Sequence, residues 1–192
     1  ALSGIWLSGA AAAALCFLLS NAVFFIRLRK SRVSEETALS PLPVYVTEAV
    51  DTPCLFGLFR PAIYLTPEAA ADDTVLRHSI QHELTHFRHG DHIWSILRGA
   101  CLALHWYNPL VWWAAALSRN DAELACDEAA VTSLSPDARA AYSEALLSCS
   151  LSGQKHRPVC PLAFGEVDVK HRVKSILSYK KPAAWVTAVC VL

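Results

Sequence analysis

The first 26 residues constrain the fold most, because they contain no charged side chain. Their polar members are small: Ser3, Ser8, Ser20 and Asn21. Within a lipid bilayer, a single segment can satisfy its backbone amides only as a helix. At about 1.5 Å per residue, this segment is long enough to cross a hydrocarbon core of about 30 Å. We therefore expect residues 1–26 to form a transmembrane helix.

Basic residues flank this segment and a second apolar segment near the end of the chain. A signal peptide carries its positive charges before the apolar run, whereas here they follow it, as is typical of a stop-transfer helix that enters the cytoplasm. These charges are Arg27, Arg29, Lys30 and Arg32. The second cluster precedes residues 183–192 and comprises Lys170, Arg172, Lys174, Lys180 and Lys181.

Together the two clusters predict three parts. Residues 1–26 form a transmembrane helix, residues 27–182 a cytoplasmic domain, and residues 183–192 the start of a truncated transmembrane helix. The chain begins with Ala1 and contains no Met, so we expect it to be part of a longer protein. Its formal net charge is zero at pH 7, which provides no basic field for direct nucleic-acid binding.

The segment 81–86 reads Gln-His-Glu-Leu-Thr-His and carries the clearest chemical signal. Apolar residues at positions 76, 80, 84 and 87 predict an amphipathic helix over about 72–89. On this helix, His82 and His86 lie one turn apart and can share a Zn²⁺ ion, while Glu83 can take a proton from the attacking water. Since the same pattern also arises by chance in solvated helices, the interpretation needs a third ligand.

Two histidines compete for the place of third ligand. His89 shares the helix face, but it lies about 10 Å along the axis from His82, farther than one ion can span. His92 has nearly the metzincin spacing. However, Gly90 falls one place late for that pattern, and the chain has no methionine for a Met-turn.

A third candidate, Glu123, lies in a helix-prone segment over about 120–134. Asp127 follows one turn later on the same face, where it could accept a hydrogen bond from a ligand histidine and fix its tautomer. Taken alone, this segment is typical of a solvated acidic helix. The presence of His82 and His86 makes the metal interpretation the favoured one.

The order and spacing of these motifs resemble those of a known family. The first motif, at 82–86, is followed 37 residues after its second histidine by Glu-x-x-x-Asp, with an aromatic stretch at 105–113 between them. This arrangement is similar to the antirepressor family of integral-membrane zinc metallopeptidases, which includes beta-lactam sensor-transducers of Gram-positive bacteria. Segment 56–67 is also similar, so the resemblance covers roughly residues 40–180.

The resemblance implies a gluzincin-type site with His82, His86 and Glu123 as zinc ligands and Glu83 as the base. It implies a peptidase in the bacterial cell membrane that faces the cytoplasm and signals by cleaving itself or a transcriptional repressor. The expected partners are the lipid bilayer, a protein substrate and, as an option, a second copy in a homodimer. No extracellular sensor lies in this sequence, so beta-lactam sensing is not carried over.

Two other interpretations stay open. In the first, the protein is a non-catalytic signalling scaffold stabilised by zinc; in the second, it is a membrane structural or transport component with a chance motif. Glu83 favours the peptidase over the scaffold, because a structural zinc site has no use for a base beside its ligands.

Residues 99–117 are also uncharged and long enough to span a membrane. A span here would place Glu123 on the opposite side from His82, and Pro109 divides the run into halves that are too short. We therefore expect these residues to form core or interfacial helices.

Between residues 43 and 65, β-branched and aromatic residues alternate with Pro53, Gly57 and Pro61, which predicts a few short strands. The resemblance implies that an edge strand holds the substrate backbone. The composition of residues 150–161 is typical of a loop. The expected fold is mainly α with a small β-sheet: a membrane-embedded, zincin-like metallopeptidase domain between transmembrane helices.

Overall fold

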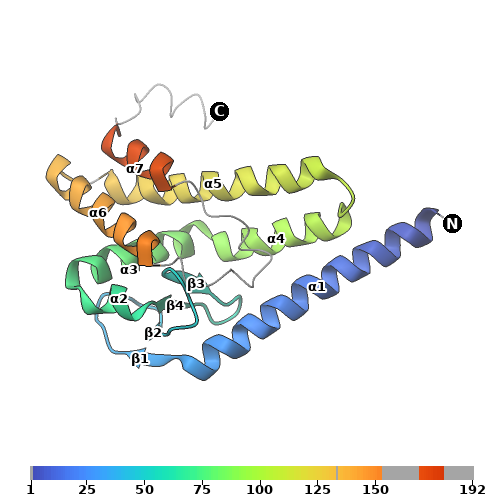
Figure 1. Cartoon of the computed structure of the whole chain (residues 1–192), viewed down its shortest axis with the longest axis horizontal. Helices are drawn as coiled ribbons and strands as arrows, with labels where there is room; N and C mark the ends of the chain where they lie inside the picture. Colours follow the sequence, from blue (N-terminus) through green and yellow to red (C-terminus); the bar gives the residue numbers. More distant parts are fainter. Residues whose placement is uncertain (1, 133, 153–168, 180–192) are drawn as a thin grey trace.

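The computed structural model describes residues 2–132, 134–152 and 169–179. It is mainly helical with one small sheet, which confirms the predicted fold class (Figure 1). Residues 183–192 and most of the predicted loop at 150–161 lie outside the described residues. The helices are α1 (Leu2–Ser31), α2 (Pro67–Ala71), α3 (Asp73–His89), α4 (Asp91–Leu104), α5 (Pro109–Val131), α6 (Pro136–Ser152) and α7 (Val169–Leu177). The strands are β1 (Val33–Glu35), β2 (Val44–Val46), β3 (Cys54–Phe56) and β4 (Ala62–Leu65).

Helix α1 is long and apolar enough to cross a membrane. It extends beyond the predicted end at residue 26, because its last turns pack on the sheet. Leu28 is fully buried there, in a cluster with Val50, Ala62 and Tyr64. From this anchor the helix runs outward along one side of the molecule to the N-terminus (Figure 1).

The sheet has the strand order β1-β2-β4-β3. Strands β2 and β4 are parallel, with Val44 opposite Ile63, and the outer pairs are antiparallel. Side chains alternate between the two faces of β4: Ile63 and Leu65 pack with the α3 residues Ile80 and Leu84, whereas Ala62 and Tyr64 face α1. The sheet thus joins α1 to the histidine-bearing helix. Strand β1 lies outside the predicted range of 43–65.

Local capping sets the ends of α3. The Asp72 side chain accepts hydrogen bonds from the backbone amides of Thr74 and Val75, and Gly90 ends the helix in the left-handed conformation at φ 74°. The chain turns at Gly90, and α4 begins at the next residue.

The uncharged run 99–117 is not one helix. It comprises the end of α4, a turn at 105–108 and the start of α5, so the two helices form an antiparallel hairpin (Figure 1). The Asn108 side chain caps α5 by accepting from the Leu110 amide, and Pro109 occupies the first helical position. Helix α5 therefore starts well before the predicted 120 and ends at Val131.

Candidate metal centre

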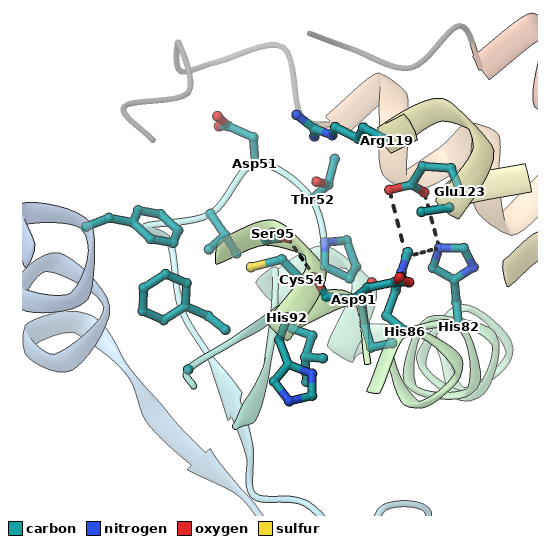
Figure 2. Close-up of a pocket in the computed structure, with 18 of the residues that line it drawn as sticks. Asp51, Thr52, Cys54, His82, His86, Asp91, His92, Ser95, Arg119 and Glu123 are labelled. Atoms are coloured by element: carbon teal, nitrogen blue, oxygen red, sulfur yellow. Dashed lines mark hydrogen bonds and ion pairs between the residues drawn. The ribbon is translucent and has the colours of Figure 1, made fainter. Parts of the chain in front are cut away.

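Three predicted ligand residues meet between α3 and α5 (Figure 2). The Nε2 atoms of His82 and His86 are 3.1 Å apart. The Glu123 carboxylate lies 3.4 Å from His82 Nε2 and 3.7 Å from His86 Nε2. Two ligand atoms of a tetrahedral zinc ion, each about 2.0–2.1 Å from the metal, lie about 3.3 Å from one another. The spacing of these three side chains therefore fits one such ion.

Glu83 lies on α3 beside His82, with an exposed fraction of only 5%. It lines the same large cavity as the three predicted ligands. The cavity is bounded by α1, by the segment around β3 and by α3 to α7, so a bound peptide could reach Glu83 and the metal position together.

His86 is oriented by the first residue of α4. Its Nδ1 lies 2.7 Å from an Asp91 carboxylate oxygen and 3.2 Å from Cys126 Sγ. Burial alone would lower the pKa of His86, but the hydrogen bonds to Asp91 and Cys126 raise this pKa well above its usual value. In the neutral form, an Nδ1–H donated to Asp91 would leave Nε2 available as a ligand.

His82 is oriented through an intervening tyrosine on α6. The Tyr142 hydroxyl lies 2.9 Å from His82 Nδ1 and donates to Asp127 Oδ1 at 2.9 Å. Asp127 itself is 3.5 Å from His82 Nδ1, so the predicted support runs mainly through Tyr142. Burial raises the pKa of Tyr142, which keeps the donor proton in place.

Arg172 on α7 is part of the same cluster. Its Nε and Nη2 atoms donate to the two oxygens of Asp127 at 2.7 and 2.8 Å, and Nη1 lies 3.0 Å from Glu123. Burial opposes ionisation of Glu123, but its histidine contacts and the Arg172 charge hold the pKa of Glu123 well below its usual value. Glu123 is therefore ionised and able to bind a cation.

Sequence reasoning missed three of these residues. Asp91 had a local signal, since it directly follows the glycine that ends α3 and lies five residues after His86. Tyr142 had none, because it comes from a separate helix. Arg172 belongs to the basic cluster that the sequence predicts to precede a second span, whereas the structure buries it beside Asp127 and Glu123 with an exposed fraction of 8%.

Neither competing histidine belongs to the group formed by His82, His86 and Glu123. The His92 ring stacks on Phe87, with ring centroids 5.5 Å apart. His89 Nδ1 lies 3.6 Å from Cys126 Sγ. Among the described residues, a second metal-capable group comprises His86, Asp91 and Cys126. It uses the Nδ1 side of His86, whereas the predicted set uses the Nε2 side.

Comparison with known proteins adds an independent observation. The model of the family described as BlaR1 peptidase M56 matches residues 1–176. The chain belongs to this family. Membership agrees with the resemblance found in the sequence and places the candidate centre in a family described as peptidases.

Two groups of M56 relatives illustrate the similarity. The chain is 29% identical over 136 residues to the methicillin resistance mecR1 protein of Staphylococcus aureus strain Mu50, an alignment that covers 68% of this chain and 23% of that protein. It is 25% identical over 157 residues to the regulatory protein BlaR1 of Bacillus licheniformis, covering 78% of this chain and 25% of that protein. The chain thus spans about a quarter of the length of these relatives.

Proposed function

We propose that this chain is the membrane-bound zinc endopeptidase part of a signalling protein. One observation carries the proposal: in a member of a peptidase family, His82, His86 and Glu123 converge at the spacing of a zinc site, with Glu83 in the same cavity. Glu123 comes from a different helix than the two histidines, so this gluzincin-type set is assembled only in the folded domain.

His82, His86 and Glu123 would hold the ion, leaving one position open as catalytic zinc sites require. When bound, zinc polarises the scissile carbonyl and makes water a nucleophile near neutral pH. Glu83 accepts the proton of the attacking water and passes it to the leaving amine. Arg172, held by Asp127, lies 3.0 Å from Glu123, and its positive charge keeps this carboxylate ionised for binding a cation.

The edge of the sheet is suited to binding an extended peptide. Strand β3 pairs only with β4 in the described sheet, and Cys54, Leu55 and Phe56 line the cavity that contains Glu83. A substrate segment could add to this edge by main-chain hydrogen bonds, as extended peptides do on exposed strands.

The family assignment supports a proposal for the substrate, and the sequence supports one for the orientation. The relatives are named as resistance and regulatory proteins, which favours a regulatory substrate over general protein degradation. We propose that the site faces the cytoplasm, where the chain cleaves itself or a transcriptional repressor. The basic residues that follow the apolar part of α1 support this orientation.

The decisive experiment compares wild type with Glu83→Gln, which keeps side-chain size but removes the base. We expect bound zinc and the fold to persist while the rate of peptide cleavage falls by about 10²-fold or more. Zinc content is measured by elemental analysis and cleavage products by mass spectrometry in cells. Signalling that survives in this variant would support the zinc-stabilised scaffold instead.

The ligand assignment has its own test. Glu123→Ala should lose much of the zinc affinity, because it removes the carboxylate of the set, whereas His92→Ala should retain it. Asp121→Ala, an exposed acidic residue on the same helix as Glu123, is the matched control. Metal retained in Glu123→Ala but lost in His92→Ala would overturn the assignment.

A further inference from the structure

The α4–α5 hairpin has a continuous apolar outer surface that no described residue covers. Its exposed side chains are large and apolar along both helices, up to 66% exposed at Leu110 and 64% at Trp113. The outer surface comprises Ile93, Trp94, Leu97, Leu104, Tyr107, Leu110, Trp113 and Leu117. An apolar surface of this extent marks an interaction site for a partner or a membrane.

The polarity of α5 changes abruptly along its length. Leu110, Trp113 and Leu117 are exposed on one side of the first half, whereas the next exposed positions include Asp121 and Glu128. Arg98 and Arg119 lie near this boundary, and both line the cavity that contains Glu83. Between Ser95 and Ser118 the only Asp, Glu, Lys or Arg residue is Arg98, and its guanidinium donates to the Ser95 and Ser118 hydroxyls.

The hairpin packs against the helix that could span the membrane. Phe17 of α1 is buried with Leu102 and Ala103 of α4, and its ring lies 6.3 Å from that of Trp112. Leu15 and Leu18 of α1 are themselves exposed, at 56% and 69%. The apolar surface of the hairpin is thus continuous with that of the candidate membrane helix.

Three backbone carbonyls at the hairpin tip, those of residues 104–106, accept hydrogen bonds. The Trp6 indole donates to the Leu104 carbonyl at 2.9 Å, and the Trp112 indole donates to the Trp106 carbonyl at 3.0 Å. The carbonyl of residue 105 accepts from the Asn108 amide at 2.9 Å. A turn facing water would not need such partners, whereas a turn in hydrocarbon does, since each unsatisfied group costs several kcal/mol there.

We propose that this hairpin inserts into the lipid bilayer beside α1 as a re-entrant element. The α4 segment from Ile93 to Leu104 is about 17 Å long at about 1.5 Å per residue, so it enters a core of about 30 Å without crossing it. Both ends of the hairpin stay on one side of the membrane, together with His82 and Glu123.

Insertion also fixes the depth of the candidate centre. Asp91, which binds His86, is the first residue of α4, and Trp94 lies less than one turn farther along the helix. The metal position is therefore at the membrane surface, within reach of a substrate segment that lies close to the bilayer. This consequence rests on the proposed function, but the insertion itself does not.

The test uses the wild-type protein in phosphatidylcholine–phosphatidylglycerol nanodiscs with a phospholipid that carries a diazirine at the end of its acyl chain. After irradiation, mass spectrometry maps the lipid adducts. We expect adducts on the outer surface of the hairpin, including Tyr107 and Leu110, and on α1. They should exceed those at the α5 positions Asp121 and Glu128 by about ten-fold, since only the former reach hydrocarbon.

Adducts on Leu15 and Leu18 without adducts on the hairpin would overturn the proposal and leave α1 in the membrane. With a photo-crosslinking amino acid in place of Trp94 or Trp113, cross-links to a second copy of the chain would overturn it in favour of a dimer. Zinc content and cleavage are measured separately on the same sample. A failure of the peptidase assignment can therefore be distinguished from a failure of the hairpin to insert. As a variant check, Leu110→Lys should reduce the hairpin adducts, whereas Asp121→Lys should leave them unchanged.

Discussion

At the scale of single residues, the candidate centre depends on what holds each imidazole in place. His82 and His86 turn their Nε2 atoms toward one another because each Nδ1 has a partner, Tyr142 in one case and Asp91 in the other. Such partners raise the basicity of a ligand histidine and fix its tautomer. The residues behind the ligands should therefore matter for metal affinity almost as much as the ligands do.

Asp91→Ala tests this expectation. Removing the acceptor leaves His86 Nδ1 with only its weaker contact to Cys126, so zinc affinity should fall by about 10–100-fold while His82 and Glu123 remain. Competition with a chromophoric chelator measures the affinity. The control variant Asp121→Ala removes an exposed acidic residue and should leave the zinc affinity unchanged. Equal affinities in the two variants would show that Asp91 does not support the site.

Arg172→Gln should destabilise the domain. Asp127 is only 2% exposed and receives two hydrogen bonds from Arg172, so the substitution leaves a buried carboxylate without its counter-charge. Breaking a buried pair in this way costs about 3–5 kcal/mol. The free energy of unfolding is measured by denaturant titration. Lys174→Gln, at an exposed position on the same helix, is the control and should change it little.

At the scale of elements, the packing of α1 against the hairpin depends on one close approach. A Cβ atom at Gly9 would overlap the Trp106 indole, whereas a Cβ at Gly4, on the same helix, would meet nothing within 4 Å. Gly9 is thus required where the ring crosses α1, and the Trp106 indole also donates to the Trp6 carbonyl at 3.4 Å.

Gly9→Val should therefore weaken this contact by about 1–3 kcal/mol, the usual cost of overpacking. Gly4→Val provides the matched control in the same helix. Thermal unfolding in nanodiscs should show a lower midpoint for Gly9→Val and an unchanged one for Gly4→Val. Identical midpoints for the two variants would mean that Trp106 can move aside without loss.

At the scale of the whole molecule, the hairpin explains how an apolar run can separate, in sequence, two parts of one candidate metal site. The chain enters the run after α3, reverses at residues 105–108, and returns to place Glu123 beside His82. Reversal makes the two ends of the run neighbours, whereas a continuous span would separate them by a bilayer.

Topology labelling tests this arrangement in cells. Cysteines placed at Arg88 and Asp137, both at exposed positions, should react from the same, cytoplasmic, side, and a cysteine at Ser3 should react from the opposite side. A membrane-impermeant maleimide applied to intact and to opened cells gives the measurement. Labelling of Arg88 and Asp137 from opposite sides would exclude the proposed site as well as the topology.

The sequence by itself determined the features that depend on a few neighbouring residues. The spacing of apolar residues, the Asp72 cap and Gly90 define α3, since helix periodicity and capping involve hydrogen bonds between residues close in sequence. With that helix given, the shared face of His82 and His86 follows. The fold class and the family resemblance were also accessible, because both depend on local patterns and their order.

Only the tertiary structure decided which distant side chains complete the site. Tyr142 and Arg172 come from α6 and α7, and their contacts with His82 and Asp127 depend on how these helices pack against α3 and α5. A basic residue before an apolar segment looks the same in sequence whether it faces water or a buried carboxylate. Burial and pairing are properties of packed surfaces, and a one-dimensional pattern does not contain the angle at which two helices meet.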